Sequence, residues 1–312
     1  MLALLCGGQG RVSAEMFDLT ADQPPAAPIF AAASVLLGED PRVMVRSGSS
    51  DLLANRTNQL LSATATLAIA ACIDTALPGE IAVTGYSVGE MAAWSIAGIW
   101  CAEAALRLTA LRAQAMDAAD GAEGQLGYVR GLTRARVDAL AAQHNCAIAI
   151  TNPGNLFVLG GARDDVAALC QAAEATGAVR AALLDVRIAS HTKRLAAAVA
   201  PFLDALKAVD GAAPKPGRQL LAGGNGARLY RAKTAMEQLA QQVATPIDWA
   251  TTLEALVERG VDAVLDLGPG HALADMMRGA FPAVKSYAAD GFRTVEGLRG
   301  WIASGGRTAG EP

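Results

Sequence analysis

The chain has 312 residues, of which 52% are hydrophobic and only 18% are charged. Globular proteins carry about 25% charged residues, so this composition excludes long disordered segments and a coiled coil. The 26 Lys and Arg residues are outnumbered by 30 Asp and Glu residues, which gives a formal net charge of -4. Since no basic run is present to follow a phosphate backbone, we expect no binding to nucleic acid.

The apolar stretches and the cysteines bear on the cellular location. Residues 91–102 are apolar but too short to cross a bilayer, which takes ~20 residues, and residues 1–6 are too short for the core of a signal peptide. We therefore expect no membrane association and a cytoplasmic protein. The cysteines are widely spaced without a C-x-x-C pair, so neither a disulfide framework nor a metal site is expected.

Along the first 125 residues, short apolar runs alternate with longer segments rich in Ala and Leu. The sequence predicts strands at residues 2–6 and 81–85, and helices at residues 58–77, 89–97 and 102–119. Strands that alternate with helices are typical of a parallel sheet covered by helices on both faces. This part of the chain is therefore predicted to begin a large α/β domain.

The predicted elements become shorter between residues 126 and 187. We expect strands and helices there in the order β-α-β-β-α-β, which is typical of a ferredoxin-like domain. They are predicted at residues 126–132, 133–143, 146–151, 156–160, 162–176 and 179–186. The expected unit is a small ferredoxin-like domain at residues 126–187.

The alternation of long helices and strands resumes after residue 187. Helices are predicted at residues 193–209, 234–244, 251–259 and 271–280, and strands at residues 261–267 and 284–288. These elements are expected to complete the large sheet. The large domain is therefore predicted from residues 1–125 and 188–312.

The strand at residues 81–85 runs into the sequence G-Y-S-V-G-E, which has Ser87 at the centre of a G-x-S-x-G pattern. A strand, this pattern and then a helix form a nucleophile elbow, in which the two glycines let the backbone turn sharply. The turn exposes the serine hydroxyl, and the N-terminus of the helix directs backbone N–H groups at an oxyanion. Ser87 is therefore the candidate nucleophile.

A serine nucleophile needs a base, and the sequence contains three histidines. His144 ends a predicted helix of the small domain, where a surface position is expected. His191 lies where the small domain returns to the large one, and clefts form at such junctions. His271 follows Gly-Pro-Gly at the start of a helix, either as a supporting group or as an ordinary helix-start residue. From the residues alone, His191 and His271 both stay open as neighbours of Ser87.

Two further features are ambiguous on their own. The glycine loop at residues 7–10 lacks the spacing of a dinucleotide site and the G-K-[ST] of a P-loop, so no bound cofactor is expected. A glycine loop at a strand end also presents a backbone N–H to an oxyanion. Arg112, in the predicted helix 102–119, is a surface residue on general grounds, although its guanidinium would suit a carboxylate.

Taken together, these motifs resemble the malonyl-CoA:acyl carrier protein acyltransferase family. The matching segments lie in the family's order, and the ferredoxin-like insertion lies in the family's place. They are G-Q-G at residues 8–10, G-Y-S-V-G-E at 85–90, L-R-A-Q-A-M at 111–116, S-H at 190–191, Q-V-A-T-P at 242–246 and D-L-G-P-G at 266–270. The resemblance implies that the large domain is α/β-hydrolase-like.

The resemblance assigns catalytic roles to four residues. It makes Ser87 the acylated nucleophile and His191 its general base, and it makes the backbone N–H groups of Gln9 and Val88 the oxyanion hole. Malonyl-CoA would acylate Ser87, coenzyme A would leave, and a carrier thiol would then attack the malonyl-serine ester. The implied activity is a ping-pong malonyl transfer by an S-malonyltransferase that needs no metal.

The resemblance also implies two substrate-binding residues. Arg112 would hold the free carboxylate of the malonyl group. Gln242 lies where the family has a glutamine near the active site, and a main-chain carbonyl in this neighbourhood usually orients the histidine. The implied acyl donor is malonyl-CoA, the implied partner is an acyl carrier protein, and no bound cofactor is implied.

Tyr86 departs from the family, which usually has a histidine before the nucleophile. The sequence G-Y-S-V-G-E is similar to that of the acyltransferase (epsilon) subunit of bacterial malonate decarboxylase. That similarity implies that the acceptor is the malonate decarboxylase carrier subunit, which bears a prosthetic group derived from coenzyme A. The alternative acceptor is the carrier protein of fatty-acid or polyketide synthesis.

Two functions of other classes stay open. An α/β-hydrolase, either an esterase or a thioesterase, also has a G-x-S-x-G elbow, and the chain order would supply Ser87, then Asp262 or Asp266, then His271. A non-catalytic subunit that docks a carrier would keep the fold but lose the nucleophile or the base. The nucleophile, the base and the arginine are all present, which disfavours such a subunit.

Overall fold

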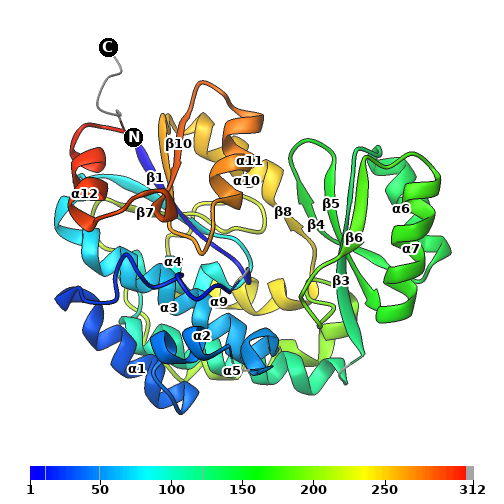
Figure 1. The fold of residues 1–312 in the computed structure, drawn as a ribbon, viewed down its shortest axis with the longest axis horizontal. Coiled ribbons are helices and arrows are strands. Elements are labelled where there is room, and N and C mark those ends of the chain that lie inside the picture. The colour runs from blue at the N-terminus through cyan, green and yellow to red at the C-terminus, as the bar shows by residue number, and fades with distance from the viewer. Residues whose placement is uncertain (11, 49, 122, 307–312) are drawn as a thin grey trace.

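A five-stranded sheet forms the centre of the larger lobe (Figure 1). The computed structural model describes residues 1–10, 12–48, 50–121 and 123–306. The strands of this sheet are ordered β10-β9-β1-β2-β7, and every pair of neighbours is parallel. They are β1 (Leu2–Cys6), β2 (Ile81–Gly85), β7 (Arg218–Leu220), β9 (Ala263–Asp266) and β10 (Lys285–Ala288). The α/β fold with a mostly parallel sheet is thus confirmed.

Alternate residues of the central strand β1 face opposite layers of helices. Leu2, Leu4 and Cys6 pack against one layer, and Ala3 and Leu5 pack against the other, as expected of a central parallel strand. The first layer contains α1 (Ala27–Leu37), α3 (Asn55–Ile73), α4 (Gly89–Ile96), α5 (Ala102–Asp120), α8 (Val199–Lys207), α9 (Ala232–Gln241) and α12 (Val295–Ala303). The second layer contains α10 (Trp249–Glu258) and α11 (Ala272–Ala280).

Several elements of the larger lobe have no counterpart in the sequence analysis. Helices α1, α2 (Pro41–Ser47) and α12 were not predicted. The start of α2 has a readable signal, because the carboxylate of Asp40 accepts from the N–H of Arg42 and Pro41 occupies the first helical position. Strand β7 spans only three residues, which is too short to produce a period-2 pattern.

The single helix predicted at residues 193–209 is wrong, because two pieces are present. The 3-10 helix η4 (Lys193–Ala198) precedes α8, and Pro201 lies in the first turn of α8. A proline is tolerated in a first turn but would break the hydrogen bonding of one continuous helix. The other 3-10 helices are η1 (Pro24–Ala26), η2 (Ser50–Leu53), η3 (Asp74–Ala76), η5 (Gln242–Ala244) and η6 (Ala289–Gly291).

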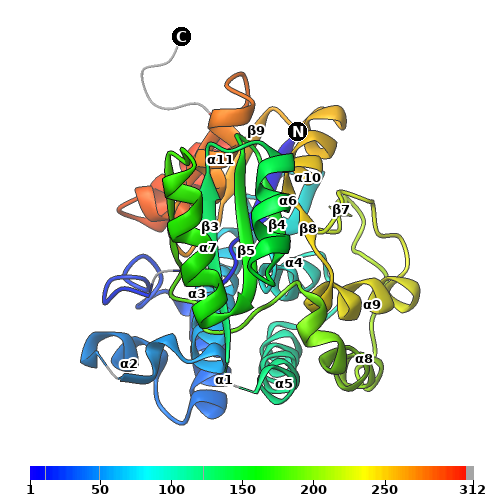
Figure 2. The same ribbon diagram turned by 90° about the vertical axis from the view of Figure 1, so that its right-hand side faces the viewer.

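The smaller lobe is a second sheet with two helices on one face (Figure 2). Its elements are β3 (Gly124–Arg130), α6 (Arg134–Gln143), β4 (Ala147–Asn152), β5 (Leu156–Ala162), α7 (Arg163–Ala175) and β6 (Arg180–Leu183). The strand order is β6-β3-β5-β4-β8, and the pairs within β3 to β6 are antiparallel. The short strand β8 (Ile247–Asp248) comes from a later part of the chain and lies parallel to β4.

The two lobes share an apolar core. Leu126, Ile150 and Val158 on the open face of the small sheet belong to the same buried cluster as Ile247 and Trp249 of the larger lobe. Strand β8 and the start of α10 thus connect the small sheet to the helical layer that covers β1. This contact fixes the position of the small lobe beside the carboxyl ends of the large parallel strands, where ligands bind in open α/β sheets.

One stretch among the described residues, Asn55–Ala76, is long and apolar enough to cross a membrane by length and composition alone. It lies outside residues 91–102, the apolar stretch that the sequence pointed to, and so was not expected. Of its most apolar window, 78% is buried inside the protein. It contains α3, which packs at the centre of the first helical layer, so its apolar composition is accounted for by the core.

Candidate active site

Ser87 lies in the sharp turn between β2 and α4, with a positive φ of 56°. Such a backbone conformation is uncommon for a residue other than glycine, and strain of this kind concentrates at functional sites. Glycine is required at both flanking positions because neighbouring backbone atoms leave no room for a Cβ atom. A Cβ atom on Gly85 would overlap the backbone of Gly89, and one on Gly89 would overlap the carbonyl group of Cys6.

The close approach of Gly89 to β1 gives a testable expectation for stability. Gly89→Ala should lower the free energy of unfolding by about 1–3 kcal/mol, because the added methyl group forces β1 and α4 apart. Urea unfolding followed by circular dichroism measures the change. The control is Gly79→Ala, where a Cβ atom meets no atom within 4 Å. Equal stability of the two variants would contradict the close packing described here.

His191 is fully buried and lies against the nucleophile. Its Nε2 is 2.7 Å from Oγ of Ser87, and its Nδ1 is 2.7 Å from the carbonyl oxygen of Gln242. A carbonyl oxygen only accepts, so Nδ1 carries the proton and Nε2 is free to accept the proton of the serine hydroxyl. The backbone N–H of His191 also donates to the carbonyl of Val243 at 2.8 Å. The ring is thus held in the tautomer of a general base.

The surroundings of His191 keep the imidazole neutral. Burial lowers the pKa of His191 to about 3, and the positive charge of Arg112 lowers it further, while the hydrogen bond to Gln242 opposes the shift. A neutral imidazole is the form that accepts a proton. His191 is therefore ready to act as a base across the neutral pH range.

Arg112 is buried in the same site, with 1% of its surface exposed. One guanidinium nitrogen donates to Oε1 of Gln59 at 2.6 Å, and another donates to Oγ of Ser87 at 3.4 Å. Burial lowers the pKa of Arg112 to about 10, so the group stays charged at neutral pH. Within the described part of the chain, no carboxylate lies within ion-pair distance of it. A buried cation beside the nucleophile is therefore available for the carboxylate of a substrate.

The glycine loop after β1 lies against the elbow. The backbone N–H of Tyr86 donates to the carbonyl of Cys6, and a Cβ atom on Gly8 would contact the carbonyl oxygen of Tyr86. Among the described residues, the N–H groups of Gln9 and Val88 donate to no protein acceptor. This leaves both groups free for an oxyanion near Ser87.

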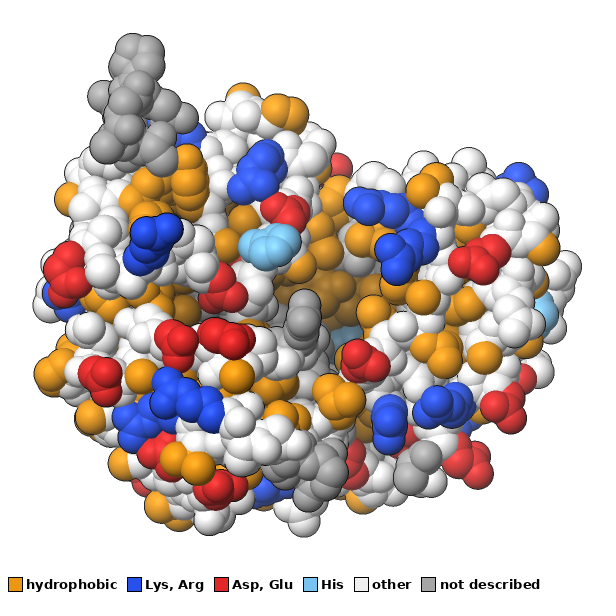
Figure 3. Space-filling view, viewed as in Figure 1, with side chains coloured by type: hydrophobic (Ala, Val, Ile, Leu, Met, Phe, Trp, Pro, Cys, Tyr) orange, Lys and Arg blue, Asp and Glu red, His pale blue; other side chains and the backbone are white. Residues whose placement is uncertain are grey.

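A cleft between the lobes lies beside this site, with Gln9 and Tyr86, the neighbours of the elbow, in its wall. Figure 3 shows a hollow between the lobes with hydrophobic side chains at its bottom. The cavity has a volume of about 540 Å³ and is lined by Gln9 and Tyr86 from the larger lobe and by Tyr128, Asn152 and Val158 from the smaller lobe, among others. A cavity of this size and character suits an organic ligand with an extended apolar arm.

Tyr86 contributes an aromatic wall to the cleft. Its ring packs edge-to-face on Trp249, with 5.2 Å between the ring centroids. Burial raises the pKa of Tyr86 above its usual range, so the phenol stays neutral. The residue that departs from the family pattern therefore joins the shared core of the two lobes and carries no charge into the site.

Gln242 contacts the base through its main chain, as the resemblance implied for this neighbourhood, and its assignment as a substrate-binding residue stays a prediction. Its side-chain Nε2 donates to Oε1 of Glu90 at 2.7 Å, and only its carbonyl oxygen contacts His191. Two further residues of the site were missed. Glu90 ends the elbow motif, which is a usable signal, whereas Gln59 in α3 has no local signal and is found only through its contact with Arg112.

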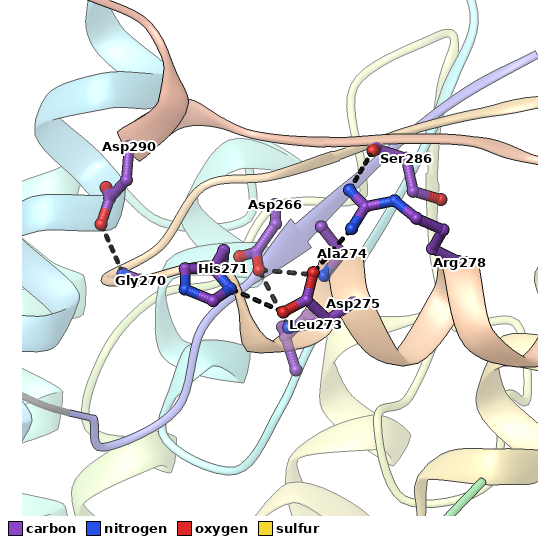
Figure 4. Close-up of polar contacts among 9 residues, drawn as sticks. All are labelled: Asp266, Gly270, His271, Leu273, Ala274, Asp275, Arg278, Ser286 and Asp290. Atoms are coloured by element: carbon purple, nitrogen blue, oxygen red, sulfur yellow. Dashed lines mark hydrogen bonds and ion pairs between the residues drawn. The ribbon is translucent and has the colours of Figure 1, made fainter. Parts of the chain in front are cut away.

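The residues of the alternative hydrolase triad are not brought together. Nδ1 of His271 lies 2.6 Å from the carboxylate of Asp275, a contact drawn in Figure 4, and the side chain of His271 is 74% exposed. Asp266 accepts hydrogen bonds from the backbone N–H groups of Gly268, Leu273 and Ala274. The carboxylate of Asp262 pairs with the amino terminus at 2.6 Å. The base that contacts Ser87 is therefore His191.

Comparison with known proteins relates this geometry to a described family. The model of the acyl transferase domain matches residues 40–289, which is well over half of the chain. The malonyl CoA-acyl carrier protein transacylase of Mycobacterium bovis is 30% identical over 293 residues, covering 89% of this chain and 92% of that protein. The polyketide biosynthesis protein ThaF of Burkholderia thailandensis is 32% identical over 203 residues, or 64% of this chain, but the match spans only 17% of ThaF.

The fold is similar to that of solved structures as well. The acyl-carrier-protein S-malonyltransferase from Burkholderia pseudomallei 1710b has a TM-score of 0.87 and 25% sequence identity, covering 96% of this chain and 99% of that chain. The chain therefore belongs to the acyl transferase domain family and is an acyltransferase. Relatives that it matches over nearly their whole length are named as malonyl transferases acting with an acyl carrier protein.

Proposed function

We propose that this acyltransferase moves a malonyl group from malonyl-CoA to the thiol of an acyl carrier protein. The observation that carries the proposal is the buried, charged Arg112, whose guanidinium lies 3.4 Å from the hydroxyl of Ser87. A malonyl thioester has a free carboxylate two bonds beyond the carbonyl carbon that reacts. A cation so close to the nucleophile can form an ion pair with this carboxylate, whereas an acetyl group has no carboxylate to pair with it.

In the first half-reaction, Nε2 of His191 takes the proton of the Ser87 hydroxyl as Oγ attacks the thioester carbonyl carbon. The N–H groups of Gln9 and Val88 stabilise the oxyanion of the tetrahedral intermediate. The carbon–sulfur bond then breaks, and His191 returns the proton to the sulfur of coenzyme A. The product is a malonyl-serine ester on Ser87.

The second half-reaction reverses these steps with a different thiol. His191 takes the proton of the carrier's thiol, the sulfur attacks the ester carbonyl, and Oγ of Ser87 leaves with the proton from His191. The malonyl group ends as a thioester on the carrier. We propose that no metal and no bound cofactor take part, since the serine, the histidine and the backbone donors supply each step.

The acyl donor is anionic at both ends, and the protein has cations for both: Arg112 beside Ser87, and two arginines on the cleft. Arg130 on β3 and Arg180 on β6 lie opposite each other in the strand register and line the same cavity as Gln9. Like charges in such a position repel unless an anion lies between them. This supports binding of the phosphates of coenzyme A at the mouth of the cleft while Arg112 holds the malonyl carboxylate.

For the acceptor, we propose the malonate decarboxylase carrier subunit with its CoA-derived prosthetic group, on the basis of the sequence G-Y-S-V-G-E around Ser87. A carrier of fatty-acid or polyketide synthesis is the alternative, and the names of the relatives favour it. We place the reaction in the cytoplasm. The strand order of residues 126–187 supports a ferredoxin-like domain, and the elbow at Ser87 supports an α/β-hydrolase-like domain built from the rest.

The test is intact-mass spectrometry with peptide mapping after brief mixing with malonyl-CoA and no acceptor. We expect a malonyl adduct on Ser87 that an added carrier thiol removes, and no adduct in Ser87→Ala. Comparing the malonate decarboxylase carrier with a fatty-acid carrier then identifies the acceptor. Release of free malonate without an adduct would point to a hydrolase, and no reaction at all would point to a non-catalytic docking subunit.

A further inference from the structure

Behind the serine and histidine lies a buried carboxyl group that the proposed chemistry does not use. Glu90 is in the first turn of α4 and is only 2% exposed. Its Oε1 accepts from the backbone N–H of Gly223 at 2.5 Å and from Nε2 of Gln242 at 2.7 Å. Burial of a carboxyl group is unfavourable unless its hydrogen bonds compensate. Both donors come from segments more than 130 residues away in the chain.

Gln242 links this carboxyl group to the base. Its side chain is held by Glu90, and its carbonyl oxygen accepts from Nδ1 of His191. The backbone N–H of Glu90 in turn donates to the carbonyl of Ser87 at 3.1 Å. Ser87, His191, Gln242 and Glu90 therefore form a closed ring of contacts, in which the elbow carries both the nucleophile and the group that anchors the partner of the base.

We propose that Glu90 is a positioning residue for His191: by holding the side chain of Gln242, it fixes the carbonyl oxygen that orients the imidazole toward Ser87. This inference rests on the proposed acyl transfer for its main readout. The imidazole makes one hydrogen bond through each ring nitrogen, so a displaced Gln242 carbonyl changes the direction of Nε2. A displacement of about 1 Å at a reacting group lowers a rate by on the order of 100-fold.

The charge of Glu90 makes this role visible in a pH profile. Burial raises the pKa of Glu90 to about 7, while the hydrogen-bond donors around it, the N–H of Gly223 foremost, and the charge of Arg112 oppose that shift. The other titratable groups around it are Cys6 on β1 and, through Gln242, His191; Glu237 of α9 is exposed and only lines the same cavity of about 520 Å³. An ionised carboxylate accepts hydrogen bonds more strongly than a neutral one.

The pKa values of His191 and Glu90 set the direction in which the rate of Ser87 acylation changes with pH. Because His191 is already neutral well below pH 7, ionisation of Glu90 is the step that changes the Gln242 contact near neutrality. Burial also raises the pKa of Asp266 to about 7, but that carboxyl accepts from the backbone of Gly268, Leu273 and Ala274 and bonds neither Gln242 nor His191. The rate of Ser87 acylation should rise as the pH increases through about 7. In Glu90→Gln, the amide oxygen accepts from the same two donors but does not titrate, so this rise should be absent.

The experiment measures single-turnover malonylation of Ser87 by rapid quench and mass spectrometry, with saturating malonyl-CoA. Glu90→Ala and Gln242→Ala should each lower the rate by on the order of 10- to 100-fold without a matching change in the concentration for half-saturation. The double variant should be no slower than the slower single variant, because both act through one contact. Glu90→Gln should restore most of the rate. Glu237→Ala, an exposed carboxylate on the same cavity, is the control and should match the wild type.

Acylation of Ser87 in Glu90→Ala at the wild-type rate would overturn the inference. Additive losses of rate in the double variant, or a rise in rate near pH 7 that persists in Glu90→Gln, would also overturn it. If Glu90→Ala does not fold, the pH profile of Glu90→Gln and the rate of Gln242→Ala decide the question. Labelling of Ser87 with a fluorophosphonate, which reacts with activated serines, separates the two proposals. Failure of the wild type to take malonyl while Ser87 is labelled would refute the malonyl transfer alone, and slower labelling of Gln242→Ala would still support the positioning role.

Discussion

Replacing His191 with alanine is expected to lower the rate at which malonyl-CoA acylates Ser87 by about 100- to 10,000-fold. The reason is that Nε2 of His191, 2.7 Å from the serine hydroxyl, is the only imidazole nitrogen that contacts Ser87 in the described part of the chain. Without it, the hydroxyl must lose its proton to water. The rate is measured by rapid quench and mass spectrometry of the malonyl-serine ester.

His271→Ala is the matched control, since it removes the histidine of the alternative hydrolase triad. His271 is exposed and bound to Asp275, so its removal should leave acylation unchanged. The reverse result, in which His271→Ala loses activity and His191→Ala keeps it, would refute the assignment of the base. Equal losses in both variants would also contradict the geometry, because only one of the two side chains contacts Ser87.

Replacing Arg112 with alanine is expected to lower kcat/KM for malonyl-CoA by about 10- to 100-fold, the usual loss for a buried hydrogen bond to a charged group. The substrate carboxylate would otherwise be buried beside Ser87 without a partner, which is unfavourable. Acetyl-CoA has no such carboxylate and should react no more slowly than with the wild type. The measurement is the ratio of the two kcat/KM values for each enzyme.

Two variants act as controls for the role of Arg112. Arg107→Ala removes an exposed arginine from the same helix and should keep the preference for malonyl. Arg112→Lys keeps a positive charge but loses the planar guanidinium that also bonds Gln59, so it should recover only part of the preference. A wild-type enzyme that uses acetyl-CoA as well as malonyl-CoA would show that Arg112 does not select the carboxylate.

Much of the fold was readable from local patterns. The strands at residues 2–6 and 81–85 match β1 and β2, because both are short apolar or β-branched runs that a glycine ends, Gly7 after β1 and Gly85 at the end of β2. The β-α-β-β-α-β order of the small lobe was readable from its turn residues. The short strands β7 and β8 were not, because two or three residues carry no periodicity and pair only when the tertiary structure brings a partner. Helix α1 has an apolar surface on most sides, so it shows little amphipathic contrast.

The candidate site likewise contains residues that local patterns predict and residues that they do not. The elbow around Ser87 is a local motif and was predicted from its spacing. The burial of Arg112 was not predictable from its helix, where an arginine is usually solvated, and only the resemblance to a family singled it out. The contact of His191 with the carbonyl of Gln242 agrees with what the resemblance implied for this neighbourhood, but the residue type alone does not indicate a backbone contact. Glu90 and Gln242 are 152 residues apart in the chain, so no local sequence pattern can indicate their contact.

The short strand β8 has a consequence for exchanging parts between members of this family. A cassette cut at the ends of β3 and β6 would leave β4 without its parallel neighbour, because Ile247 and Asp248 come from the other lobe. The segment that supplies β8 begins only a few residues after Gln242, whose carbonyl holds His191. A functional chimera must therefore inherit residues 242–248 together with the small lobe, so the wall of the cleft and the orientation of the base are expected to evolve as one module.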